Sequence, residues 1–172
     1  MMKLQLTPVV HDRREGLHLQ KLSISINIVN TKMAVAAPTD FKYLSNQACL
    51  AAKEFGKLYF STFDRQRHKL VKLYADLSTV VWNGNAYTGT TKINEFFVSL
   101  PATAHKLTSM DCQPINGIAT SNRISILVVC EGYVKYGNEN ERKYFSQTFI
   151  LLLSDNEKWK IVSDCFRFID NE

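Results

Sequence analysis

The sequence predicts an α+β domain in which helices pack on one face of a mostly antiparallel sheet. Three observations support this prediction: a helical period near residue 40, strand-like runs separated by turn residues after residue 77, and helices that mainly precede the strands. The predicted order is helix, helix, two strands, helix and four strands. A length of 172 residues, 45% of them hydrophobic, suits one such domain.

The first predicted helix is long and one-sided. Thr39 or Asp40 can cap its free backbone amides, because a short polar side chain accepts a hydrogen bond from the first turn. Apolar side chains then recur at steps of three and four through residues 41–62, which is the period of an amphipathic helix. A shorter second helix is predicted over residues 70–74.

A β-hairpin and a third helix are predicted next. Residues 77–82 are rich in β-branched side chains, an Asn-Gly turn signal follows at residues 83–85, and residues 86–89 return as a second strand. Thr90 or Thr91 can cap the third helix, which ends before a proline.

Four more strands complete the predicted sheet, at residues 105–113, 123–134, 142–153 and 159–168. The second and third of these carry apolar side chains at both odd and even positions, so both of their faces are expected to be buried. Three helices can cover only one face of such a sheet. The other face is therefore expected to be covered by a partner protein, which is the main functional prediction from the pattern alone.

The basic charge of the chain is concentrated at the N-terminus. Residues 1–39 contain five basic and two acidic side chains, so most of the formal charge of +5 lies before the first predicted helix. Residues 1–37 are predicted to form a disordered extension and residues 38–172 the domain, with Met33 as an alternative initiator. The charge of the domain is too balanced to indicate nucleic-acid binding.

The four cysteines do not follow a metal-binding spacing. Cys49, Cys112, Cys130 and Cys165 form no CxxC pair, and no histidine stands at zinc-finger spacing, so neither a metal nor another cofactor is expected. They are interpreted as reduced core residues, which favours a reducing compartment. The N-terminus lacks the pattern of a secretory signal, and no apolar run is long enough to cross a membrane.

Three features have alternative interpretations. A basic cluster is either a solvated turn or a contact for RNA phosphates; it comprises Arg65, Arg67, His68, Lys69 and Lys72. A second group either meets in a cone and supports proton transfer or consists of separate structural residues; it comprises Tyr59, Tyr74, His105 and Asp111. Trp82 is either a core residue or one wall of an apolar peptide pocket. No catalytic motif accompanies these residues, and no catalytic residue is predicted.

Arg167 lies in a largely apolar stretch of the last strand. It follows Phe166, and in a regular strand it shares one face with Trp159, Ile161 and Cys165, although a bulge would change this parity. A guanidinium on an apolar face needs an acceptor. The acceptor is expected either within the fold or, more in keeping with an uncovered sheet face, on a partner protein.

Three motifs together resemble the nuclear transport factor 2-like family. They are Val81-Trp-Asn-Gly-Asn85, Asp111-Cys-Gln-Pro114 and Trp159-Lys-Ile-Val-Ser-Asp-Cys-Phe-Arg-Phe168. The likeness covers roughly residues 38–170 and points to the export-related branch of the family, the small subunit of the heterodimeric messenger-RNA export receptor. It implies a cone in which three helices pack on a curved, mostly antiparallel sheet.

The resemblance implies a non-enzymatic adaptor in the nucleus and cytoplasm. Such a protein pairs through its sheet with the large subunit of the export receptor, stabilises it and supports docking on Phe-Gly repeats at the nuclear pore, so that it carries messenger RNA indirectly. By the same resemblance, Arg167 pairs with an acid of the large subunit and Asp111 with a partner arginine. The other interface residues that it implies are Cys165, Val129, Phe166 and Gln113.

Two other classes within the same fold are alternatives. The homodimeric import member binds the GDP form of the small GTPase Ran through acids, but at two matching positions this chain has Asn83 and Gly137. The loss of these charged contacts disfavours Ran binding. The fold also includes small isomerases and dehydratases, whose catalytic patterns Tyr59, His105 and Asp111 do not reproduce.

Overall fold

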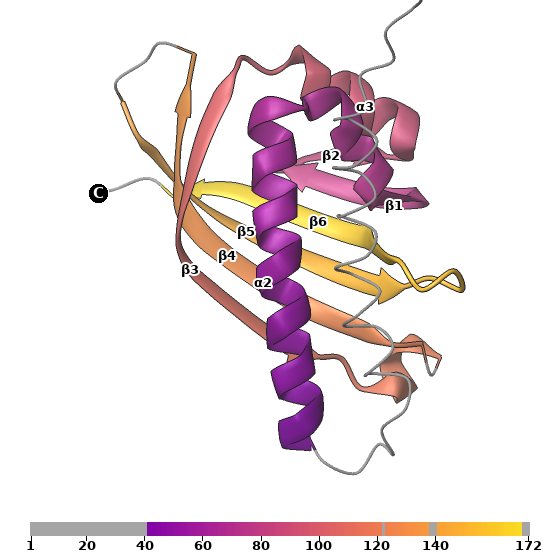
Figure 1. The fold of residues 1–172 in the computed structure, drawn as a ribbon. Helices are drawn as coiled ribbons and strands as arrows, with labels where there is room; N and C mark the ends of the chain where they lie inside the picture. The colour runs from indigo at the N-terminus through magenta and orange to yellow at the C-terminus, as the bar shows by residue number, and fades with distance from the viewer. Residues whose placement is uncertain (1–40, 122, 138–140, 170–172) are drawn as a thin grey trace, which may run out of the picture.

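The computed structural model describes residues 41–121, 123–137 and 141–169, and Figure 1 shows how they are arranged. Its helical segments are the long helix α2 (Phe41–Arg65), the 3-10 helix η1 (Arg67–Leu73), the helix α3 (Thr90–Ser99) and the short 3-10 helix η2 (Gly117–Thr120). The predicted extension at residues 1–37 and the predicted caps Thr39 and Asp40 lie outside the described residues.

The described strands form one sheet, made of β1 (Tyr74–Trp82), β2 (Asn85–Thr88), β3 (Thr103–Pro114), β4 (Ser125–Tyr136), β5 (Lys143–Leu153) and β6 (Trp159–Ile169). Their spatial order is β2-β1-β6-β5-β4-β3. The β1–β6 pair is parallel, and the other pairs are antiparallel. The predicted order of elements and the mostly antiparallel sheet are therefore confirmed.

The structure differs from the prediction around residue 74. The second helix is a 3-10 helix that ends at Leu73, and Tyr74 instead begins β1 by pairing with Ile161. Burial explains this early switch to strand, because Tyr74 is 2% exposed and its hydroxyl reaches the carboxylate of Asp164 on β6. The residue that looked like the end of a helix is thus held by the sheet.

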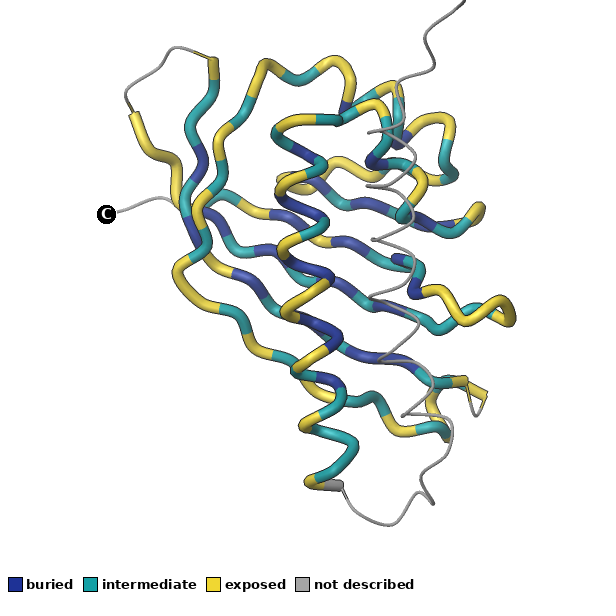
Figure 2. The backbone as a smooth tube through the Cα atoms, in the orientation of Figure 1, coloured by how far each residue is buried: buried dark blue, intermediate teal, exposed yellow. Residues whose placement is uncertain are grey.

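The described helices cover one face of the sheet (Figure 1). On β4 the side chains of Ile126, Val128 and Cys130 are fully buried on this face, whereas Leu127 and Val129 on the opposite face are half-buried. Figure 2 shows the same alternation along the central strands. The face that carries Leu127 and Val129, which no described helix covers, is called the outer face below.

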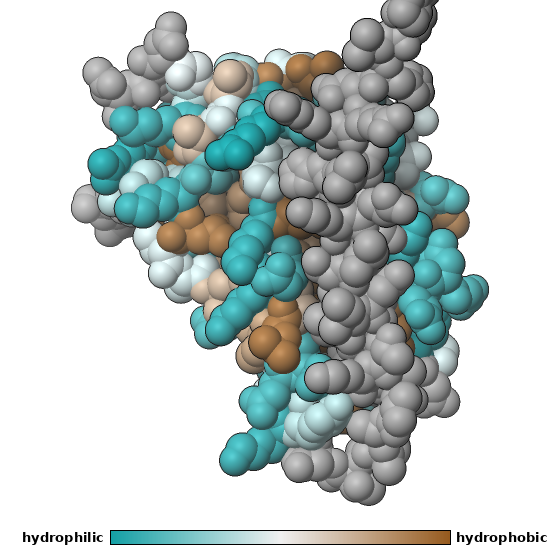
Figure 3. Space-filling view, viewed as in Figure 1, coloured by the Kyte–Doolittle hydropathy of each residue, from teal (hydrophilic) through white to brown (hydrophobic). Residues whose placement is uncertain are grey.

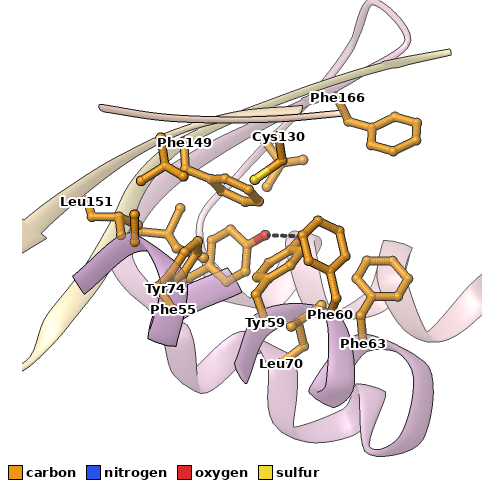
Figure 4. Close-up of a cluster of buried hydrophobic side chains, with 14 of the residues drawn as sticks. Phe55, Tyr59, Phe60, Phe63, Leu70, Tyr74, Cys130, Phe149, Leu151 and Phe166 are labelled. Atoms are coloured by element: carbon orange, nitrogen blue, oxygen red, sulfur yellow. Dashed lines mark hydrogen bonds between the residues drawn. The ribbon is translucent and has the colours of Figure 1, made fainter. Parts of the chain in front are cut away.

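The helical side has a polar surface and an aromatic interior. Mostly hydrophilic side chains line the exposed side of α2 (Figure 3). Beneath them, the ring of Phe149 lies 4.7 Å from that of Tyr59 and 5.0 Å from that of Phe55, while Phe166 stacks on Trp82 at 3.7 Å between centroids. Figure 4 shows rings from α2 meeting side chains from the strands in one cluster. The interior is a packed core.

Candidate functional site

The register of the strands places three of the predicted interface residues in one row on the outer face. Asp111 on β3 lies opposite Val129 on β4, Val129 opposite Thr148 on β5, and Thr148 opposite Cys165 on β6. Side chains that lie directly opposite each other on neighbouring strands are about 5 Å apart. Residues that are far apart in the sequence therefore form a continuous strip across four strands.

The rows on either side of this strip carry two more predicted residues. On one side, Arg167 lies opposite Ser146, which lies opposite Glu131. On the other side, Gln113 lies opposite Leu127. The outer face thus combines half-buried apolar side chains near its middle with exposed charged and polar side chains at β3 and β6. This composition is typical of a surface that binds another protein.

Arg167 reaches solvent without an ion pair among the residues that the structure describes. The nearest acid along its own row is Glu131, two strands away, and the Glu131 carboxylate accepts a hydrogen bond of 3.2 Å from the Ser109 hydroxyl. The acceptor of Arg167 was expected either within the fold or on a partner protein. Among the described residues, the fold supplies no such acceptor.

Arg167 does not share a face of the sheet with Trp159 and Ile161, although a regular strand would place all three on one face. Trp159 and Ile161 are buried, while Arg167 is exposed on the other side of the sheet. The β5–β6 register shifts between Ile150 and Leu151, so one extra residue on β6 reverses the parity. Arg167 consequently shares the outer face with Cys165 but not with Trp159 and Ile161.

Phe166 and Trp82 belong to the core. Phe166 is 1% exposed and Trp82 is 6% exposed, and their rings are stacked with an interplanar angle of 4°. The expectation that Phe166 lies at the outer-face interface is corrected here, because adjacent residues on a strand point to opposite faces and Arg167 points outward. For Trp82, the structure favours the core interpretation over the wall of an open peptide pocket.

The cysteines are not all core residues, in contrast to the interpretation from sequence. Cys130 is fully buried, but Cys165 is exposed on the outer face. Cys49 and Cys112 are half-buried, and their sulfur atoms lie 2.9 Å apart. The sequence contains no signal for this contact, because it depends on how α2 crosses β3.

The four polar residues that could meet in one cone do not converge as a set. Asp111 lies on the outer face, away from the interior. His105 instead contacts Asp64, with its Nδ1 atom 2.6 Å from Oδ1 and its backbone amide donating to Oδ2 at 2.9 Å. The hydroxyls of Tyr59 and Tyr74 lie together at 3.1 Å in the core (Figure 4). The structure therefore favours the interpretation of separate structural residues.

Asp164 is a buried carboxylate that the sequence did not assign to any site. It accepts hydrogen bonds from the Tyr74 hydroxyl at 2.6 Å, the Gln147 amide at 2.8 Å and the Tyr59 hydroxyl at 3.3 Å. Burial raises the pKa of Asp164 from 3.8 to about 6, although these three donors act in the opposite direction. Asp164 lies three residues before Arg167, and residues an odd number of positions apart in a strand point to opposite faces. Because Arg167 points outward, this spacing is the sequence signal that Asp164 points inward.

Replacing this carboxylate by an amide in Asp164→Asn is expected to remove one pH-dependent part of the stability. The folded state binds the Asp164 proton more tightly than the unfolded chain, so the carboxyl stabilises the fold below its ordinary pKa, and this contribution is lost as the pH rises through about 6. The free energy of unfolding of the native chain, relative to Asp164→Asn, should fall by on the order of 3 kcal/mol between pH 4 and pH 7.

Urea unfolding of the native chain and the variant at several pH values measures this difference. Asp111→Asn removes an exposed carboxylate from the outer face and serves as the matched control. A stability difference between the native chain and Asp164→Asn that stays constant from pH 4 to pH 7 would contradict the role assigned to Asp164.

One member of the basic cluster has a structural role. The Arg67 guanidinium donates to the carbonyl oxygens of Phe97 and Leu100 at the end of α3, and at 2.9 Å to the Thr103 hydroxyl. That hydroxyl in turn donates to Asp64 at 2.8 Å. Arg67 thus satisfies backbone acceptors where α3 ends and joins α3 to β3. This arrangement favours a structural turn over a phosphate-binding cluster.

Residues 51–168 match the nuclear transport factor 2 (NTF2) domain family. This chain belongs to the nuclear transport factor 2 domain family. Human NTF2-related export protein 2 is 42% identical over 139 residues, which are 79% of this chain and 97% of that protein. Bovine NTF2-related export protein 1 is 44% identical over 137 residues, which are 78% of this chain and 97% of that protein. The solved structure of nuclear transport factor 2 from Cryptosporidium parvum has a TM-score of 0.62 and 26% identity, and covers 78% of this chain and 99% of that one.

The similarities concern both the fold of this chain and its role. The fold agrees with the solved structure in the order of its helices and strands, and a role in nuclear export fits the relatives. No described helix is long and apolar enough to cross a membrane. Among the residues that the structure describes, His, Cys, Asp and Glu side chains form no group of three that could hold a metal ion.

Proposed function

We propose that this chain is a non-enzymatic adaptor that pairs through its outer face with the large subunit of the messenger-RNA export receptor. The observation that carries the proposal is the strip from Asp111 through Val129 to Cys165, flanked by Arg167, on the sheet face that no described helix covers. Pairing would stabilise the large subunit and support docking of the complex on Phe-Gly repeats during passage between nucleus and cytoplasm.

Apolar and charged side chains would contribute differently to this pairing. Half-buried Leu127 and Val129 lose water contact when a second sheet covers them, and burial of apolar surface contributes roughly 25 cal/mol per Å². Asp111 on β3 and Arg167 on β6 lie on different strands of the same face. Two charges of opposite sign at separate points fix the register of a partner and disfavour a partner with the wrong charges.

The interior of the domain supports a binding role over a catalytic one. The space between α2 and the sheet is occupied by rings such as Phe55, Tyr59 and Phe149, with centroids 4.7 to 5.7 Å apart. Asp111, the acid of the proton-transfer group considered from the sequence, lies on the opposite face. The catalytic alternative therefore lacks open space, and the polar groups that do meet in the interior, around Asp164, are buried and hydrogen-bonded to one another.

The geometry around Asn83 also supports the export role over Ran binding. Asn83 has a φ of 49°, and its side-chain oxygen accepts a hydrogen bond of 2.8 Å from the Phe168 amide. This neutral side chain holds the β1–β2 turn against β6. Gly137, at the second position that matches an acid of the import member, has a φ of 52° and carries no side chain. Neither residue supplies the charge that the import contacts need.

Affinity purification of the full-length tagged chain from cells, followed by mass spectrometry, tests the proposal. The expected result is retention of one large subunit that contains its own nuclear transport factor 2-like domain, at near-equal amounts and through a high-salt wash. Salt leaves an apolar interface largely intact but weakens a purely ionic one. Recovery of Ran in its GDP form as the main partner, or of only a second copy of this chain, would overturn the proposal.

A further inference from the structure

Two cysteine thiols from distant parts of the chain lie in contact. Cys49 is on α2 and Cys112 is on β3, 63 residues further along, and the Cys112 thiol donates to the Cys49 sulfur at 2.9 Å. Both side chains are half-buried, so a small molecule can reach them from solvent. Because the sulfur atoms already touch, a bond between them requires only a small shift.

The packing of α2 on β3 holds this thiol pair in place. Ala48, Ala51 and Ala52 are at most 5% exposed, and their small side chains let the helix lie close to the sheet. One turn further, a Cβ added to Gly56 would lie only 2.1 Å from the Met110 Cε atom. These small residues therefore let α2 pack directly on the sheet in the region of the thiol pair.

The other two cysteines are placed where they cannot join the pair. Cys112 lies opposite Val128, whose side chain is fully buried, so Cys112 faces the helical side of the sheet. Cys165 lies on the outer face, with the sheet between it and the pair. Cys130 is fully buried on β4 and is out of reach of solvent. Among the four thiols, only Cys49 and Cys112 are both accessible and adjacent.

We propose that Cys49 and Cys112 are a redox modification site at which a hydroperoxide converts the two thiols into a reversible disulfide between α2 and β3. In the first step the Cys49 sulfur attacks the peroxide, forming a sulfenic acid and releasing one alcohol or water molecule. In the second step the Cys112 sulfur displaces the sulfenic hydroxyl as water. The thiols together lose two protons and two electrons, and the O–O bond of the peroxide is reduced; a reduced dithiol reverses the reaction.

The order of the two steps follows from the surroundings of Cys112. Burial, together with the neighbouring Cys49 thiol, raises the pKa of Cys112 to about 12, so Cys112 remains protonated when the oxidant arrives. Because the Cys112 thiol donates to the Cys49 sulfur, Cys49 is the thiol that reacts first, and Cys112 is the resolving thiol, whose proton leaves with the sulfenic hydroxyl as water. The disulfide joins α2 to β3, which is an edge strand of the sheet. It reduces the conformational freedom of the unfolded chain and thereby stabilises the fold.

Titration of the full-length chain with hydrogen peroxide, followed by intact and peptide mass spectrometry, tests the proposal. One equivalent should remove two hydrogen atoms from the mass, remove two thiols from reaction with a thiol reagent, and yield one linked peptide pair that contains Cys49 and Cys112. The midpoint of thermal unfolding should rise by about 5–10 °C. Dithiothreitol should restore both the mass and the midpoint.

Three single variants identify the thiols that take part. Cys165→Ser should oxidise as the native chain does, Cys112→Ser should stop at a sulfenic acid on Cys49, and Cys49→Ser should leave Cys112 unmodified. The native and Cys165→Ser results also remain readable if a variant of the pair folds poorly. A gain of oxygen atoms without cross-linking, a disulfide-linked dimer, or a linked peptide that contains Cys165 would overturn the proposal.

Discussion

Arg167→Asp is expected to abolish pairing with the large export receptor subunit while the isolated domain stays folded. Arg167 is exposed and has no ion pair among the described residues, so its replacement removes little from the stability of the monomer. In the complex, an acid of the partner would face a second acid and stay unpaired. Such a loss costs on the order of 2–5 kcal/mol, or roughly 30-fold to several thousand-fold in affinity.

Titration calorimetry and co-purification with the large subunit measure this effect, and circular dichroism checks the fold. Lys92→Asp makes the same change of charge at an exposed position of α3, on the helical side, and should bind as the native chain does. If the Arg167→Asp chain co-purified at normal yield, the outer face would not be the surface that recognises the partner.

Phe149→Ala is expected to cause a large loss of stability. Phe149 is fully buried on β5, and its ring contacts those of Phe55 and Tyr59 from α2. Truncation removes the ring from the centre of the cluster, and the sheet and helix cannot close the cavity completely. Substitutions of this kind cost about 3–5 kcal/mol, which is a large part of the total stability of a domain.

Urea unfolding gives the free energy directly, and thermal unfolding should show a fall in the midpoint on the order of 10 °C. Phe149→Leu retains most of the apolar volume and should lose considerably less. A loss below about 1 kcal/mol in Phe149→Ala would mean that the core around α2 is not packed as described.

Local patterns were sufficient to predict most of the fold. The helical period of α2 reflects the burial of Ala48, Phe55 and Tyr59 on one side, and the apolar residues on both faces of β4 correspond to a buried inner face and a half-buried outer one. The Asn83-Gly84 pair marked the β1–β2 turn because both residues adopt positive φ values there. These features depend on neighbours in the sequence, which is why the sequence reveals them.

Features that depend on register and packing were not predictable in the same way. The shift of register opposite Ile150 and Leu151 reverses the parity of β6, which separates Arg167 from Trp159 and leaves Phe166 in the core. Asp164 accepts hydrogen bonds from Tyr59 and Tyr74, which are more than 60 positions away in the chain, and from the nearer Gln147. Cys49 and Cys112 are also more than 60 positions apart. Only the assembled sheet and helix bring these groups together.

The reactivity of Cys165 towards a maleimide, in the free chain and in the complex with the large export receptor subunit, tests the central claim most directly. Cys165 is exposed on the outer face, and Val98→Cys places a comparison thiol on α3, where Val98 is 56% exposed. Peptide mass spectrometry reads the two sites separately. We expect the complex to protect Cys165 and to leave the thiol at position 98 as reactive as before. Unchanged labelling of Cys165, together with protection at position 98, would place the partner on the helices and contradict the account.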